Sequence, residues 1–375
     1  ASDVYKRQIM HALKRFGTAF GGYKMMENYP VPECGPDDII LEIKAAAICG
    51  ADMKHWGVDN GYDDTNITPD QQQSVRGHEF AGEIVKVGEN VKDWHIGQRV
   101  VSDNSAHVCG VCPACEQGDF LCCEHKVNLG LDNNTWGGGF SKYCKVPGEI
   151  LAIHKHAIWE IPEGIKYEEA CVLDPICNAY KAVAQQSHLI PGQDVVVFGT
   201  GPLGLFSVQV AKLMGAVNIV MVGLDDDVKV RFGVAKELGA THCVNGSKED
   251  VVARCTEICG RDNLGLVIEC SGANIALKQA IEMTRPNAEI VRVGMGFKPL
   301  EFSINDITAW NKSIIGHMAY DSTSWRNCIR LLQSGQIKVQ PMITHRLGLS
   351  QWQEGFDKMA KKEAIKVIFH YDYND

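Results

Sequence analysis

The stretch DVVVFGTGPLG, residues 194–204, decides the fold of the second half of the chain. Its apolar run, Val195–Phe198, predicts a short buried strand, and the glycines that follow fit the pattern G-x-G-x-x-G. A helix is predicted from Leu203, so the pattern lies between a strand and a helix, which indicates a dinucleotide-binding turn rather than an ordinary glycine-rich turn. Free N–H groups at such a helix start face anionic phosphates. The predicted cofactor contacts are Gly199, Gly201, Pro202, Leu203 and Gly204.

Strands and helices alternate around this turn. Short apolar strands are predicted at 194–198, 219–222, 266–270 and 289–293, and helices at 203–214, 227–238 and 275–283. Apolar strands separated by helices are typical of a parallel sheet that is covered on both faces. Residues 167–319 are therefore predicted to form a doubly wound α/β domain of the Rossmann type.

The part of the chain before this domain has a different pattern. Strand-like runs at 39–45, 83–87 and 99–101 are punctuated by glycines, which predicts a β-rich, barrel-like domain over residues 10–166. The tail, residues 320–375, is expected to return to that domain. The regular pattern begins near Met10, so residues 1–9 are expected to be a leader or another extension outside the fold.

Composition excludes several classes of function. The chain has 375 residues, of which 45% are hydrophobic and 22% charged, as in ordinary globular proteins. The net charge of -9 provides no basic surface for nucleic acid or an anionic membrane. No apolar run approaches the ~20 residues of a spanning helix. We therefore expect a cytoplasmic protein with no nucleic-acid or membrane partner.

The acidic residue that binds the adenosine ribose is expected about 20 residues after the glycine turn. Here the second strand ends near Gly223, and three aspartates follow at 225–227. We predict that Asp225 contacts the ribose and that the next two aspartates are N-terminal charges of the following helix. Arg231 is the alternative contact, to a 2′-phosphate. Because three acids repel that phosphate, NAD is favoured, and NADP remains possible.

Four cysteines lie close together in the first half of the chain. Cys109, Cys112, Cys115 and Cys123 have the spacing C-x2-C-x2-C-x7-C. Four thiolates can enclose one tetrahedral ion and leave no open position, which predicts a structural zinc site. Chemistry alone leaves the fourth ligand open between Cys123 and its neighbour Cys122, and an iron–sulfur cluster is the competing metal site.

A second group of possible metal ligands is more widely spaced. Cys49 ends an early strand, and His78 and Glu79 begin another. Taken singly, Cys49 is more often a core cysteine and His78 a histidine satisfied by ordinary hydrogen bonds. Taken together, a thiolate, an imidazole and a carboxylate can bind zinc and leave one position open, as a catalytic zinc requires.

With these residues identified, the chain resembles the zinc-dependent medium-chain dehydrogenase/reductase family from about Met10 to Tyr371. Within that family it is most similar to the polyol branch, typified by sorbitol dehydrogenase. The matching motifs are Cys49-Gly50-x-Asp52, Gly77-His78-Glu79-x-x-Gly82, the four-cysteine lobe and Gly199–Gly204. The stretches Leu173-Asp174-Pro175 and Pro341–Arg346 support the resemblance.

The resemblance implies a GroES-like catalytic domain, a nucleotide-binding domain and a substrate site in the cleft between them. It implies two zinc ions per chain. Cys49, His78 and Glu79 would hold the catalytic ion, and Asp174 would be a fourth ligand or would contact the water at the open position. Asp52 would brace the first ligand. The family spacing selects Cys123 as the fourth structural ligand.

Two departures from the family concern the proton relay. Many members have Ser or Thr where this chain has Ala51, and His where it has Lys54. Which residue relays the proton is therefore left open, with Lys54 and the adjacent His55 as the candidates. Trp56, Tyr320 and Phe297 are candidates for the walls of the substrate pocket, and each is at least as well explained by core packing or an interface.

The reaction implied by the resemblance is hydride transfer between a secondary alcohol of a polyol or sugar-derived substrate and NAD(P). The alternatives are an L-threonine-type or aldose C1 dehydrogenase and, less favoured, a non-catalytic zinc or redox sensor. By the same resemblance a homodimer or homotetramer is expected, formed through the edge of the nucleotide domain near 289–306.

Overall fold

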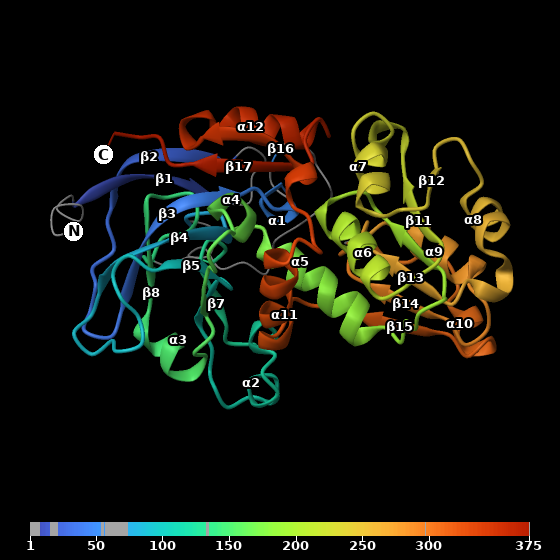
Figure 1. Cartoon of the computed structure of the whole chain (residues 1–375), viewed down its shortest axis with the longest axis horizontal. Helices are drawn as coiled ribbons and strands as arrows, with labels where there is room; N and C mark the ends of the chain where they lie inside the picture. Colours follow the sequence, from blue (N-terminus) through green and yellow to red (C-terminus); the bar gives the residue numbers. More distant parts are fainter. Residues whose placement is uncertain are drawn as a thin grey trace. The chain divides into compact units, whose positions relative to one another are not determined.

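The computed structural model describes residues 8–15, 22–53, 56, 74–132, 135–296 and 298–374. The chain divides into two compact units. One comprises Ala1–Asp174 and Ile343–Asp375, and the other comprises Pro175–Met342 (Figure 1). The C-terminal tail of the first unit is part of its main sheet, because strand β17 (Lys366–His370) pairs with strand β3 (Ile39–Ala47).

The second unit is built on a parallel sheet of six described strands in the order β12-β11-β10-β13-β14-β15. Every pair of neighbours in this sheet is parallel. The strands are β10 (Val195–Phe198), β11 (Ile219–Gly223), β12 (His242–Asn245), β13 (Leu266–Glu269), β14 (Glu289–Arg292) and β15 (Ser313–Gly316). The predicted doubly wound α/β class is confirmed.

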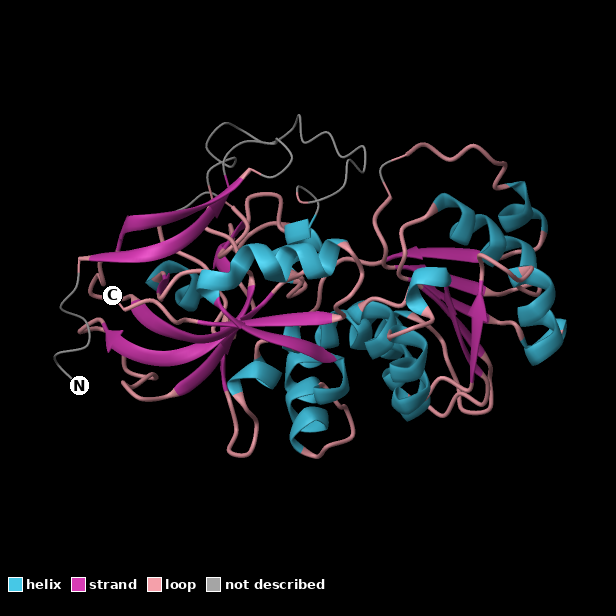
Figure 2. Ribbon diagram, turned by 90° about the horizontal axis from the view of Figure 1, so that it is seen from above, coloured by secondary structure: helices cyan, strands magenta, loops and turns pink. Residues whose placement is uncertain are grey.

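Helices cover both faces of this sheet (Figure 2). The helices of this unit are α6 (Pro202–Leu213), α7 (Arg231–Leu238), α8 (Val251–Cys259), α9 (Asn274–Met283), α10 (Asn305–Ala309) and α11 (Ser322–Gln333), with a π-helical segment at Lys181–Gln186. Parallel strands need such crossovers, and a right-handed crossover changes face when the strand order reverses. The core strands are consequently apolar on both sides, and Val196, Val220, Val267 and Ile290 are completely buried.

One predicted helix start was wrong. A helix was predicted over 227–238, whereas α7 begins at Arg231 and Asp225–Asp227 form a separate 3₁₀ turn. The reason is a local hydrogen bond, in which the backbone N–H of Leu224 donates to Oδ2 of Asp227 at 2.8 Å. Short acidic side chains readily make such bonds and thereby compete with helix formation.

The first unit is β-rich, as predicted. Its main sheet has the order β16-β17-β3-β4-β5-β9, with β8 paired to β3, and every described pair is antiparallel except β16 with β17. The further strands of this sheet are β4 (Glu79–Val87), β5 (Arg99–Ser102), β8 (Tyr143–Val146), β9 (Ile158–Glu160) and β16 (Ile343–Gly348). Two small sheets pair β1 (Ile9–Arg15) with β2 (Tyr23–Pro30), and β6 (Ser105–His107) with β7 (Val127–Asn128).

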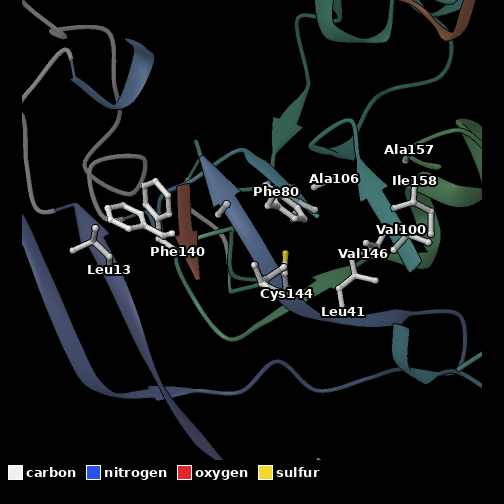
Figure 3. Packing of buried hydrophobic residues seen from close by; sticks show 14 of the residues in the cluster. Leu13, Leu41, Phe80, Val100, Ala106, Phe140, Cys144, Val146, Ala157 and Ile158 are labelled. Carbon is white, nitrogen blue, oxygen red and sulfur yellow. The ribbon is translucent and has the colours of Figure 1, made fainter. Parts of the chain in front are cut away.

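Short helices complete this unit. They are α1 (Gly50–Met53), α2 (Pro113–Glu116), α3 (Gly148–Ile153), α4 (Tyr167–Ala170) and α12 (Trp352–Ala360), and α5 (Leu173–Tyr180) leads the chain into the second unit. The core packs between the strands, where Leu41, Phe80, Val100, Phe140 and Val146 are completely buried (Figure 3). Among the residues that the structure describes, no helix is long and apolar enough to cross a bilayer.

Candidate active site

Pairing of β3 with β4 brings the three predicted catalytic ligands together. Cys49 follows the end of β3, His78 precedes β4, and Glu79 is the first residue of β4, opposite Ala47. Each of the three offers one ligand atom, and these atoms lie within 4.8 Å of one another. His78 and Glu79 are 5% and 1% exposed, so the group lies inside the protein.

A glycine directs His78 into this group. Gly77 has φ = 90°, a conformation that costs a glycine little and other residues more. Space also requires glycine, because a Cβ here would lie 2.6 Å from the ring of Phe140. The carbonyl of Gly77 accepts a hydrogen bond from the N–H of Gly139 at 2.6 Å, which fixes the turn.

The donor set fits a zinc ion. Among the described residues, Oε1 of Glu79 has no hydrogen-bond partner although the residue is buried. An unpaired buried carboxylate oxygen is costly unless a cation completes it. Burial raises the pKa of the Cys49 thiol well above its usual value, and the charge of Glu79 raises it further. A bound divalent cation would instead lower the pKa of this thiol and favour the thiolate. Zinc binds sulfur, nitrogen and oxygen donors of this kind.

Lys366 is a site residue that the sequence did not reveal. It lies in β17, is 1% exposed and forms an ion pair with Oε2 of Glu79. Its ammonium also donates to the carbonyl of Ile48 at 3.1 Å. Although burial alone would lower the pKa of Lys366, the charge of Glu79 raises it. The available signal was a lysine within the apolar run AIKVIF, residues 364–369.

Asp52 contacts the segment of Cys49 and the side chain of Arg76. Its Oδ2 accepts a hydrogen bond from the backbone N–H of Cys49 at 3.0 Å. Its Oδ1 lies 3.3 Å from the guanidinium of Arg76 and 4.0 Å from Nδ1 of His78. The hydroxyl of Tyr23 donates to the carbonyl of Asp52, and burial raises the pKa of Tyr23 to about 12. Asp52 is thus held rigidly beside two of the three predicted ligands.

Asp174 is a predicted catalytic residue that acts electrostatically on Cys49 without belonging to the group of three ligand atoms. Its charge helps to raise the pKa of Cys49. Its Oδ2 accepts a hydrogen bond from the side-chain amide of Asn104 at 3.1 Å. Lys54 and His55, the candidates for the proton relay, lie outside the described residues.

The pocket-wall candidates have other surroundings. Trp56 packs edge-on against Trp352 and Phe356, and its indole N–H donates to Asp357 at 3.2 Å. The ring of Tyr320 is 3% exposed and packs against Trp325. Phe297 lies outside the described residues. The two described aromatic residues are therefore explained by packing.

The four-cysteine lobe has the geometry of a tetrahedral site. The sulfurs of Cys109, Cys112, Cys115 and Cys123 lie within 4.8 Å of one another. Adjacent Sγ atoms are separated by 3.5, 3.6 and 4.0 Å. Zn–S bonds of ~2.3 Å in a tetrahedron place the sulfurs ~3.8 Å apart, so the lobe can hold zinc with little movement. Cys122 is exposed and does not belong to the group.

The glycine turn lies where the strand order of the second unit reverses. The chain passes from β10 to β11 and β12 on one side, and then to β13 on the other side of β10. Ligands of such sheets bind outside the carboxyl ends of the strands at this point. Gly199 has φ = 93°, and a Cβ on Gly204 would lie 1.8 Å from the carbonyl oxygen of Gly199. A Cβ on Gly201 would meet no atom of the described residues within 4 Å, so among these residues nothing packs against this backbone. Pro202 and Leu203 begin α6.

The residues after β11 have distinct environments. Asp225 is half exposed, and its Oδ1 accepts from the amide of Asn245 at 2.7 Å and lies 3.1 Å from the ammonium of Lys248. Arg231 is directed elsewhere, since its guanidinium lies 3.5 Å from the buried Asp227 and is 12% exposed. Burial lowers the pKa of Arg231. The two predicted cofactor contacts therefore differ in exposure, since the carboxylate of Asp225 is accessible to solvent and the guanidinium of Arg231 is largely buried.

Comparison with known families agrees with this geometry. Residues 35–156 match the alcohol dehydrogenase GroES-like domain, and residues 202–334 match the zinc-binding dehydrogenase family. The chain belongs to the zinc-dependent medium-chain dehydrogenases and is similar to their polyol dehydrogenases. It is an NAD(P)-dependent alcohol dehydrogenase that uses zinc and acts on a small alcohol.

Individual relatives span nearly the whole chain. The chain is 77% identical over 366 residues to YdjL, a zinc-type alcohol dehydrogenase-like protein of Escherichia coli (strain K12), covering 98% of this chain and 100% of that one. It is 30% identical to a sorbitol dehydrogenase of Halalkalibacterium halodurans, covering 92% and 95%. Among solved structures, 2R,3R-butanediol dehydrogenase from Bacillus subtilis matches with a TM-score of 0.81 at 29% identity, covering 97% and 100%.

Proposed function

We propose that this enzyme oxidises a secondary alcohol of a polyol or sugar-derived substrate and reduces NAD in a reversible hydride transfer. The observation that carries the proposal is the group of Cys49, His78 and Glu79, whose ligand atoms lie within 4.8 Å of one another. Similarity to a sorbitol dehydrogenase over 92% of this chain supports the polyol class.

In this proposal Cys49, His78 and Glu79 hold the catalytic zinc, which when bound supplies a Lewis acid that lowers the pKa of the substrate hydroxyl. Lys366 pairs with Oε2 of Glu79, so Oε1 would be the oxygen available to hold the metal. Asp52 holds the backbone of Cys49 in place. Ala51 has no group that can carry a proton, so Lys54 and His55 are the proposed candidates for the relay.

NAD is the proposed cofactor rather than NADP. No atom of the described residues would contact a Cβ on Gly201, so a pyrophosphate can approach this turn beside the start of α6. Asp225 lies just beyond β11, where its carboxylate can accept hydrogen bonds from the ribose hydroxyls and repel a 2′-phosphate. Arg231, the residue that would have favoured NADP, is paired with Asp227.

A substrate panel tests both proposals. The zinc-loaded enzyme is assayed for reduced nicotinamide with polyols, aldoses, sugar acids and amino alcohols, including L-threonine, each with NAD and with NADP. We expect the highest kcat/KM with a polyol and NAD. A preference for L-threonine or for C1 of an aldose would contradict the polyol class, and a preference for NADP would contradict the role of Asp225.

The edge of the nucleotide-binding unit supports a further proposal, that two copies of the chain associate through β15. This strand ends the sheet and, among the described strands, pairs with β14 alone. Exposed apolar side chains lie around it, with Ile304, Trp310, Ile314 and Met318 between 37% and 53% exposed. Edge strands of this kind pair readily with a second chain, and a two-fold axis lets the same edge serve both copies.

The change Ile314→Lys tests this association. Two lysines brought to one two-fold interface repel each other, so the variant is expected to be monomeric at micromolar concentration while the wild-type protein is at least dimeric. Sedimentation velocity measures both masses. The matched control is Ile275→Lys, because Ile275 is 60% exposed on α9 and should leave the mass unchanged. A monomeric wild-type protein would contradict the proposal.

A further inference from the structure

We propose that Asn104 is a positioning residue that orients Asp174 toward the catalytic zinc. The inference rests on the proposed function and on the role that the family resemblance implies for Asp174, as a fourth zinc ligand or a contact of the water at the open position. It concerns the loop between β5 and β6. Nδ2 of Asn104 donates a hydrogen bond to Oδ2 of Asp174 at 3.1 Å, and Asn104 itself is 3% exposed. A hydrogen bond to one carboxylate oxygen fixes the plane of the carboxyl group, as outer partners of metal ligands commonly do.

The backbone of Asn104 is held in an unusual conformation. Its φ of 61° lies in the left-handed region, which residues other than glycine enter at a cost. Both backbone groups are engaged, since the N–H donates to Oγ of Ser102 at 2.9 Å and the carbonyl accepts from the N–H of Leu129 at 2.7 Å. Asparagine enters this region more readily than most other residues, and the two backbone bonds hold it there. The amide of Asn104 then reaches Asp174.

The residue before Asn104 anchors the loop on its other side. Oδ2 of Asp103 and Nε2 of His154 are 2.5 Å apart, and both residues are buried. Oδ1 of Asp103 accepts from the N–H of Ser105 at 3.0 Å. The ring of His154 packs on Phe120, which lies beside the four-cysteine lobe, at a centroid distance of 4.2 Å. A chain of contacts thus joins the lobe, the loop and Asp174.

The test separates the side chain of Asn104 from its backbone conformation. Asn104→Gly removes the amide, and glycine adopts φ = 61° without strain, so the fold is preserved. We expect this variant to bind the catalytic zinc 10- to 100-fold more weakly in chelator competition, as is typical when such an outer partner is lost. The kcat should fall while the Kd for NAD stays unchanged. Asn104→Asp keeps the shape and removes the N–H donor to Asp174, so it should also weaken zinc binding.

A double-mutant cycle identifies the partner. In an Asp174→Ala background, Asn104→Gly should change zinc affinity by less than about twofold, because the side chain through which it acts is gone. Zinc affinity does not depend on turnover, so this result stands even if no alcohol in the panel is oxidised. Wild-type zinc affinity in both Asn104 variants would overturn the proposal, and so would an undiminished effect of Asn104→Gly in the Asp174→Ala background.

Discussion

Replacement of His78 by Ala is expected to lower kcat by at least about 1000-fold and to leave a folded protein that binds NAD. The imidazole is one of three donors whose ligand atoms lie within 4.8 Å of one another, and loss of one donor removes the Lewis acid from the site. That acid contributes several kcal/mol to a charged transition state, and each 1.36 kcal/mol corresponds to a factor of about ten in rate. Steady-state kinetics measures kcat, metal analysis measures the zinc content, and a binding titration measures the affinity for NAD.

The control for this variant is His95→Ala. His95 is an exposed histidine of the same unit and lies outside the metal groups, so its loss should change neither kcat nor zinc content. The His78→Ala protein should retain the zinc of the cysteine lobe and lose the other ion. Near-normal kcat in His78→Ala, or an unchanged content of two zinc ions, would show that the catalytic metal is held elsewhere.

The sequence was most informative where ligands are close together along the chain. The cysteine lobe lies within fifteen residues, 109–123, and the glycine turn within six, 199–204, so local geometry alone brings each group together. The group of Cys49, His78 and Glu79 is longer in range, yet both of its segments lie at the ends of strands that pair. The alternation of apolar strands and helices likewise predicted the parallel sheet, because strands buried on both faces leave a strong pattern.

The sequence was least informative where tertiary contacts determine the position of a side chain or the end of a helix. Lys366 is 287 residues from Glu79, and nothing in its own segment shows that the β17–β3 pairing brings the two together. Asn104 looks like a loop residue, and only the left-handed backbone and the distance to Asp174 reveal its direction. The start of α7 was misplaced because one side-chain bond, from Leu224 to Asp227, outweighed the helical pattern. Such effects depend on particular atoms and leave no periodicity.

Replacement of Cys112 by Ser is expected to lower the melting temperature by roughly 10 °C or more, as the loss of a few kcal/mol does in domains of this size. Cys112 contributes one of four sulfurs to the lobe, and Phe120 of the lobe packs on His154 in the rest of the first unit. Structural zinc sites contribute directly to folding, so three thiolates without the fourth leave the lobe poorly held. Thermal melting with and without a chelator measures the effect.

A control variant and a chelator comparison distinguish loss of the structural zinc from a general destabilising effect of replacing a cysteine. Cys122→Ser is the matched control, because Cys122 is adjacent to Cys123 in sequence but exposed and outside the sulfur group, and its melting temperature should equal that of the wild type. A chelator should lower the wild-type melting temperature much more than that of Cys112→Ser, which has already lost the ion. Equal melting temperatures for the two serine variants would mean that the lobe is not a closed four-sulfur site. The assignment of one zinc ion to structure, in the lobe, and the other to catalysis would then be wrong.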